Sequence, residues 1–116
     1  MKTLKREIGD YGERVAVKYL EKKGYTILER NYLKKTGEID IIAKKDDIIS
    51  FIEVKTRKNF QNSYASEAVN YYKQQRIIKT AQNYIVEKNY LDLKLSFDVC
   101  EVYTEIKKIK FIENAF

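Results

Sequence analysis

The sequence predicts a single α/β domain in which a mixed β-sheet is flanked by helices. Two long segments carry apolar residues at helical spacing, and five shorter segments are rich in isoleucine, valine and aromatic residues. The chain of 116 residues has room for one hydrophobic core, and neither proline nor a Gly/Ser-rich linker marks an internal boundary. We therefore expect one domain over residues 1–116, with the element order α-β-β-β-α-β-β.

The first expected element is a helix from about Thr3 to Lys23. Its apolar residues recur at helical spacing, and they are Leu4, Ile8, Tyr11, Val15 and Tyr19. Gly24 follows where a C-terminal cap belongs. Small residues form a second face of this helix, suited to close packing on a sheet, and they are Gly9, Gly12 and Ala16. Glu13 lies at the edge of that small-residue face.

Three strands are expected next, over Tyr25–Tyr32, Glu38–Ala43 and Ile48–Lys55. The polar turn 44–47 joins the second of these strands to the third. Because that connection is short, the two strands should form an antiparallel hairpin.

A polar loop at 58–66 separates the strands from a second helix, expected over Val69–Lys88. The apolar face of this helix carries Ile77, Ala81, Tyr84 and Ile85. Two closing strands are expected over Lys94–Tyr103 and Ile106–Glu113. The resulting order fits a mixed sheet covered by helices.

Histidine is absent, which excludes serine–histidine triads, cysteine–histidine pairs and histidine-ligated metals. Acid–base chemistry would fall to carboxylates, lysines or tyrosines, and a carboxylate site favours the hard cations Mg²⁺ and Mn²⁺. Cys100 is the only cysteine, so it forms no internal disulfide. Its apolar neighbours in 97–103 indicate a buried residue.

The net charge of +6 and the isoelectric point near 9.3 favour nucleic acid as a partner. Lysine and arginine gain affinity for nucleic acid by releasing the counterions of its phosphates. A solvated lysine-rich surface without such a partner is the alternative. The sequence contains no apolar run long enough to span a bilayer, and it does not start with a signal peptide. We therefore expect a cytoplasmic protein with no membrane partner.

Glu53 interrupts an otherwise apolar strand. Alternation along this strand puts Phe51, Glu53 and Lys55 on one face, with Ile52 and Val54 on the other. Burying a lone carboxylate or a lone ammonium is costly, so both charged side chains need partners.

Asp40 is the corresponding charge on the neighbouring strand, and Glu38 should share its face. The opposite face should carry Ile39, Ile41 and Ala43. Hairpin geometry can bring Asp40 beside Glu53, and a divalent cation would relieve the repulsion between the two carboxylates. The alternative is an internal salt bridge, from Lys55 to Glu53 or Asp40, without chemistry.

Glu13 and Lys73 each allow two interpretations. From the edge of the small-residue face, Glu13 either reaches the two carboxylates or stays at the solvent boundary. Lys73, one helical turn before Ile77, either points toward the same centre or is solvated. Periodicity alone does not separate these alternatives.

The arrangement of Asp40 with Glu53-Val54-Lys55 resembles the PD-(D/E)xK signature of restriction-endonuclease-like nucleases. Nearly the whole chain is similar to the YraN family, uncharacterised bacterial proteins that resemble archaeal Holliday junction resolvases. The matching segments are 9–13, 24–25, 30–31, 37–43, 51–57, Lys73 and 97–99. One departure is Ile39, which stands where the superfamily motif has proline.

This resemblance implies a restriction-endonuclease-like sheet, with Glu13, Asp40, Glu53 and Lys55 clustered in a nuclease-type site. Under this hypothesis, Asp40, Glu53 and the Val54 carbonyl hold Mg²⁺ or Mn²⁺. Lys55 would orient or help to deprotonate the attacking water and stabilise the phosphorane, and Glu13 would complete the metal shell directly or through water.

Phosphate contacts are expected from Arg57, Lys58 and Lys73, which would position DNA without reading its sequence. The sequence resembles no base-reading module, so the expected selectivity is for DNA structure: junctions, flaps or ends. A symmetric homodimer fits cleavage of two strands together, although no sequence feature requires one.

The alternatives to a nuclease are a non-catalytic nucleic-acid-binding module on the same fold and a structural domain for a protein partner. Steep salt dependence of DNA binding would exclude the structural domain.

Overall fold

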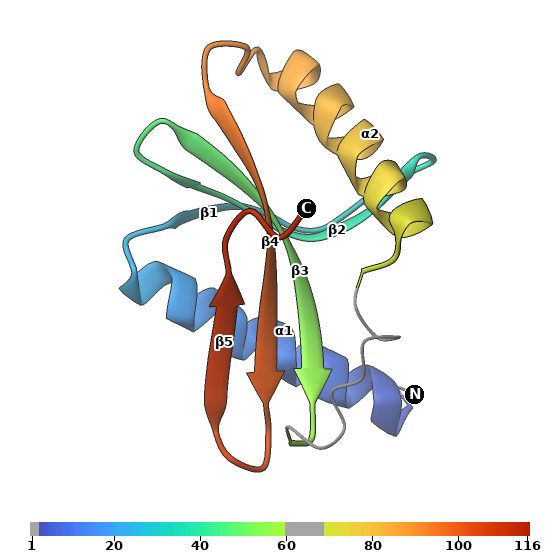
Figure 1. Cartoon of the computed structure of the whole chain (residues 1–116), viewed down its shortest axis with the longest axis vertical. Helices are drawn as coiled ribbons and strands as arrows, with labels where there is room; N and C mark the ends of the chain where they lie inside the picture. The colour runs from blue at the N-terminus through green and yellow to red at the C-terminus, as the bar shows by residue number, and fades with distance from the viewer. Residues whose placement is uncertain (1–2, 60–68) are drawn as a thin grey trace.

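The computed structural model describes residues 3–59 and 69–116, and its elements follow the expected order α-β-β-β-α-β-β (Figure 1). The elements are α1 (Leu4–Lys22), β1 (Thr26–Lys34), β2 (Gly37–Lys45), β3 (Ile48–Arg57), α2 (Tyr71–Lys88), β4 (Lys94–Tyr103) and β5 (Lys108–Ile112). Of the polar loop expected at 58–66, residues 60–66 lie outside the described part of the chain.

The described strands form one mixed sheet in the order β1-β2-β3-β4-β5. β3 and β4 are parallel and are connected through α2, whereas the other neighbouring strands are antiparallel. The predicted hairpin of β2 and β3 is confirmed. Its turn is tighter than expected, because Lys45 still pairs with Ile48 and only Asp46 and Asp47 lie between them.

Both helices begin at a capping side chain. The Thr3 hydroxyl accepts a hydrogen bond from the Arg6 amide at 3.1 Å, and the Asn70 side chain accepts one from the Lys73 amide at 2.8 Å. Asn70 therefore starts α2 at Tyr71, slightly later than the hydrophobic pattern predicted. Neither helix in the described part of the chain is long and apolar enough to cross a membrane.

Left-handed backbone conformations set other boundaries. Gly24, with φ of 96°, follows α1 where the C-terminal cap was expected, and Asn89, with φ of 58°, caps α2. Lys107 has φ of 50° and lies in the turn that precedes β5. The last strand therefore begins at Lys108 instead of Ile106.

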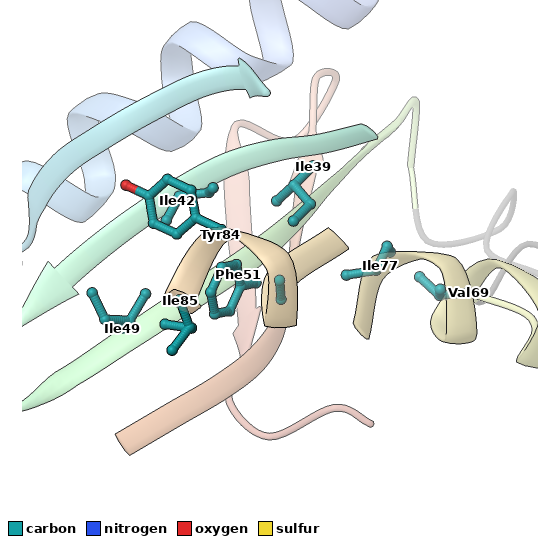
Figure 2. Close-up of a cluster of buried hydrophobic side chains, with 9 residues drawn as sticks. Ile39, Ile42, Ile49, Phe51, Val69, Ile77, Tyr84 and Ile85 are labelled. Atoms are coloured by element: carbon teal, nitrogen blue, oxygen red, sulfur yellow. The ribbon is translucent and has the colours of Figure 1, made fainter. Parts of the chain in front are cut away.

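The sheet carries a hydrophobic cluster on each face, and each cluster is covered by one helix. On the α2 side, Ile42 and Phe51 pack against the expected apolar face of α2, which is Ile77, Ala81, Tyr84 and Ile85 (Figure 2). On the α1 side the buried residues are Ala16, Leu20, Ile41, Ala43, Ile52, Cys100 and Val102. Cys100 is fully buried as expected, and burial raises the pKa of its thiol to about 12.

The predicted position of Ile39 is wrong. Ile39 packs with Phe51 in the α2-side cluster, whereas Ile41 and Ala43 pack on the α1 side. The backbone explains this break in alternation, because the ladder between β2 and β3 ends at the pair Ile41 and Ile52. Across from this point in β1, Asn31 adopts a left-handed conformation with φ of 52°. The strands therefore separate at Asp40, and the simple two-residue period does not continue through it.

Candidate active site

Asp40 lies where β2 leaves β3. Its Oδ2 atom accepts a hydrogen bond from the Val54 amide at 2.9 Å. The regular ladder between the two strands has already ended, so the Asp40 side chain takes the place of a backbone acceptor. The N–H and C=O groups of one strand residue point to the same neighbouring strand, which directs the Val54 carbonyl to this same gap.

Glu53 is the second carboxylate of the centre, and its side chain is only 6% exposed. Burial and the negative charge of Glu53 together raise the pKa of Asp40 to about 8. The hydrogen bond from Val54 opposes this shift but does not cancel it. Two neighbouring carboxylates in a shielded site therefore repel each other, and a cation would relieve that repulsion.

The structure provides two lysines beside the carboxylates. The Lys73 ammonium donates a hydrogen bond to Glu53 Oε1 at 2.8 Å, so Lys73 points toward the centre and not into bulk solvent. Burial alone would lower the pKa of Lys73, but the hydrogen bond and the charges of Glu53 and Asp40 together raise it. Lys55 shows the opposite balance: burial and the nearby Lys73 charge lower its pKa.

Glu13 approaches the same centre from α1. Its Oε1 atom is buried and has no hydrogen-bond partner among residues 3–59 and 69–116. Burial raises the pKa of Glu13, the Arg30 charge opposes this, and Asp10 adds to it. The charge of Glu13 also raises the pKa of Asp40, so the two carboxylates lie within electrostatic reach. Of the two interpretations open for Glu13, the structure favours the one that directs it toward the carboxylate pair.

Close packing of α1 allows this approach. Gly12 is buried against Thr56 of β3, and a Cβ atom at this position would lie 3.1 Å from Thr56 Cβ and overlap the Thr56 hydroxyl. Of the small-residue face predicted for α1, Gly12 and Ala16 are buried toward the sheet, whereas a Cβ atom at Gly9 would meet no described atom within 4 Å. The close contact at Gly12 brings the neighbouring Glu13 near β3.

A pocket of about 440 Å³ opens over the two carboxylates. Its lining residues are Leu33, Gly37, Glu38, Asp40, Glu53, Asn70, Tyr72, Lys73 and Arg76. Leu33, Asn70, Tyr72 and Arg76 were not identified from the sequence. The N-terminal half of α2 thus forms one wall of the pocket, and the adjoining ends of β1 and β2 form the other.

Arg57 and Lys58, expected to contact phosphate, line a different pocket of about 700 Å³ near the start of α1. Arg57 Nε lies 3.8 Å from Glu101 Oε2, and Lys58 Nζ lies 3.7 Å from Glu105 Oε1. Their assignment to nucleic-acid binding stays a prediction, and of the three expected phosphate contacts the structure brings only Lys73 to the carboxylates.

The donor atoms at this centre suit a hard divalent cation. Asp40, Glu53 and the Val54 carbonyl offer only oxygen, which Mg²⁺ and Mn²⁺ prefer. Within residues 3–59 and 69–116, no three acidic or cysteine side chains are grouped closely enough to enclose a metal. The role of Glu13 in the metal shell, directly or through water, stays a prediction.

The fold and the site together define an α/β domain in which a pair of carboxylates occupies the gap between two separating hairpin strands, beside two lysines. Residues 12–102 match the model of the Uncharacterised protein family UPF0102, and the chain belongs to this family, which confirms the resemblance to YraN proteins. A UPF0102 protein of Clostridioides difficile is 50% identical over 111 residues, covering 96% of this chain and 97% of the relative. A UPF0102 protein of Alkaliphilus metalliredigens is 48% identical over 114 residues, covering 97% and 100%.

Proposed function

We propose that this protein is a metal-dependent endonuclease that hydrolyses phosphodiester bonds in DNA and selects its substrate by structure. The observation that carries the proposal is the carboxylate pair of Asp40 and Glu53, held at the Val54 backbone in a shielded site. A raised Asp40 pKa means that the ionised pair is unfavourable as it stands. An arrangement of this kind gains most from a bound divalent cation.

Asp40, Glu53 and the Val54 carbonyl would hold Mg²⁺ or Mn²⁺, which supplies a Lewis acid and lowers the pKa of bound water. Lys55 is half-buried, and burial and the Lys73 charge lower its pKa, so losing its proton costs less than for a free lysine and it would accept a proton from the attacking water. In its protonated form the same side chain stabilises the negative charge that develops on phosphate. Glu13 of α1 would order water at the edge of the site, since its Oε1 atom is buried without a partner among the described residues.

The charges around the pocket support a phosphate ligand. Lys73 and Arg76 line the pocket wall formed by α2, and the chain carries a net charge of +6. Neither residue belongs to a recognisable base-reading module, so these contacts would position DNA without reading its sequence. A symmetric dimer would place two such sites on a branched substrate.

A non-catalytic nucleic-acid-binding module is the second candidate, and the ion pair of Lys73 with Glu53 favours it. This pair compensates one of the two carboxylates with a cation from the protein itself. In a pure binding module that contact would be structural, and the remaining basic residues would hold the DNA backbone.

Cleavage assays with a matched pair of variants test the two candidates. The purified protein is incubated with labelled branched, flapped, single-stranded and linear DNA in Mg²⁺ or Mn²⁺, beside Asp40→Asn and Asp92→Asn. Asp92 is exposed and far along the chain from the centre, so its variant controls for the loss of one negative charge. Cleavage that requires metal, survives in Asp92→Asn and is lost in Asp40→Asn supports the endonuclease. Salt-sensitive DNA binding without cleavage by any of the proteins supports the binding module.

A further inference from the structure

Two exposed apolar side chains stand on opposite walls of the pocket that contains the carboxylate pair. Leu33 of β1 is 70% exposed and Tyr72 of α2 is 72% exposed, although both line this pocket. Exposed apolar side chains that flank a polar cavity commonly mark a binding surface. Nothing in the hydrolysis of a phosphodiester bond requires them.

Hydrogen bonds fix the two walls relative to each other. Arg76 Nε donates to the Thr36 carbonyl at 3.0 Å, and the hydroxyls of Thr36 and Thr80 are 2.7 Å apart. Gly37 also packs closely on α2, since a Cβ atom there would lie 3.2 Å from Thr80 Oγ1. The middle of α2 is therefore tied to the turn between β1 and β2, next to which the helix lies (Figure 1).

Tyr72 is oriented by a cation. The Arg76 guanidinium lies 5.9 Å from the centre of the Tyr72 ring, in the range of a cation–π contact, and its hydrogen bond to Thr36 holds it in place. The ring remains largely exposed. A rigid aromatic surface beside an arginine and a lysine matches the combination that stacks on bases and neutralises phosphates in single-stranded nucleic acid.

Duplex DNA does not offer this ligand, because its bases are already stacked on one another and only their edges are accessible in the grooves. An unpaired nucleotide offers both a free base face and a flexible phosphate. The pocket of about 440 Å³ is within the usual size range of small-ligand sites. Tyr72 and Leu33 can contact the base, while Lys73 and Arg76 face the adjoining phosphates.

We propose that Tyr72, supported by Leu33, stacks on the base of an unpaired DNA nucleotide next to the carboxylate centre. The substrate class is then DNA that presents an unpaired nucleotide at the phosphodiester bond: a single strand, a flap or an open branch point. The inference rests on the proposed function, since it assigns the substrate of the same pocket. Its test is nevertheless a binding experiment that does not require cleavage.

The experiment measures binding of a single-stranded DNA containing 2-aminopurine, and of a blunt duplex, in EDTA. Tyr72→Ala should weaken single-strand binding by about 5- to 100-fold, because stacking of one base contributes on that order. Tyr72→Phe should bind like the wild type. The wild type and Tyr72→Phe should quench the fluorescence of 2-aminopurine, and Tyr72→Ala should not. All three proteins should bind the duplex with equal affinity. The salt dependence should stay unchanged, since stacking involves no phosphate.

Tyr71→Ala is the matched control. Tyr71 is 75% exposed on the same turn of α2 but does not line the pocket, so its removal should leave single-strand binding intact. Equal losses in Tyr71→Ala and Tyr72→Ala, or an equal loss for duplex and single strand in Tyr72→Ala, would overturn the proposal. If Tyr72-dependent quenching is observed in EDTA but no DNA is cleaved in the separate assays with Mg²⁺ or Mn²⁺, the stacking site stands and the endonuclease fails. Circular dichroism confirms that each variant is folded.

Discussion

Asp40 binds the backbone with the same carboxylate that would hold the metal in the proposed nuclease. One oxygen accepts the Val54 amide, which would otherwise lose its partner where the strands separate. That hydrogen bond favours the ionised form, but burial and the Glu53 charge outweigh it and raise the pKa to about 8. The side chain is therefore held in position by one interaction and kept receptive to a cation by the others.

Lys73 should compete with a metal for Glu53. Its ammonium already contacts Glu53 Oε1 at 2.8 Å, and a bound cation needs the same carboxylate. The Lys73 side chain is 42% exposed, so solvent weakens its ion pair with Glu53. Removing this ion pair should therefore change the affinity of the site for a metal ion by only about 2- to 5-fold. We expect Lys73→Met to tighten Mn²⁺ binding to the DNA-free protein by that factor, measured by calorimetry or electron paramagnetic resonance.

The same substitution should weaken DNA binding, because the variant loses one candidate phosphate contact. The slope of log affinity against log salt should become less steep by about 0.7 to 0.9. Lys79→Met is the control, since Lys79 is a lysine on the same helix and its substitution makes the same change of charge. Unchanged or weaker Mn²⁺ binding in Lys73→Met would show that Lys73 does not compete for the carboxylate.

Helix α1 positions Glu13 through the absence of a side chain at Gly12. Alanine generally stabilises a helix relative to glycine, by about 1 kcal/mol. At Gly12, however, the added Cβ atom would lie 3.1 Å from Thr56 Cβ and overlap the Thr56 hydroxyl, so α1 must move away from β3. We expect Gly12→Ala to lower the free energy of unfolding by about 1–3 kcal/mol, as is typical of overpacking, in urea titrations.

Gly9→Ala on the same helix is the matched comparison, because a Cβ atom added at Gly9 would meet no atom of the described residues within 4 Å. There the helix propensity acts alone, and the free energy of unfolding should rise by about 0.5–1 kcal/mol. Combining Gly12→Ala with Thr56→Ala should recover much of the loss, since the colliding hydroxyl is gone. Similar effects of both single substitutions would show that Gly12 does not set the distance between α1 and the sheet.

The regular spacing of apolar residues in each helix and strand could be read from the sequence. The places where the backbone departs from regular strand pairing could not. Alternation placed Phe51 and Ile52 on opposite faces correctly, because β3 keeps regular partners along its length. It failed for Ile39 because β2 leaves β3 at Asp40, and strand separation depends on pairing with distant residues. That separation is also what creates the gap between Asp40 and Val54.

The residues that form the pocket walls were harder to predict from the sequence than the strand faces. Tyr72 and Arg76 are exposed residues of α2, and exposed positions contribute nothing to a hydrophobic period. They join the site because α2 docks on the turn between β1 and β2 through Thr36 and Thr80, residues that are far apart in the sequence. The carboxylates, by contrast, interrupt apolar strands and were visible as exceptions to the pattern.

The chain carries a positive net charge, yet it contains several carboxyl groups whose ionisation is made unfavourable by burial. The pKa values of Glu13, Asp40 and Asp98 are all raised, in each case mainly by burial. Asp98 is fully buried, and its Oδ2 atom has no hydrogen-bond partner in the part of the chain that the structure describes. A carboxyl group whose pKa is higher in the folded than in the unfolded protein binds protons more tightly when folded. Stability should therefore fall as pH rises from the unfolded pKa toward the folded one.

For Asp40 this interval extends from its ordinary value of 3.8 to about 8. We therefore expect the melting temperature of the metal-free protein, in EDTA, to fall between about pH 5 and pH 8. Asp40→Asn cannot ionise, so its melting temperature should fall less over this range, and the difference from wild type should grow with pH. Addition of Mg²⁺ should stabilise the wild type most at pH 8 and the variant little, because the cation binds the ionised pair. Parallel pH profiles for the two proteins would show that Asp40 ionises normally and that the carboxylates do not form a strained pair.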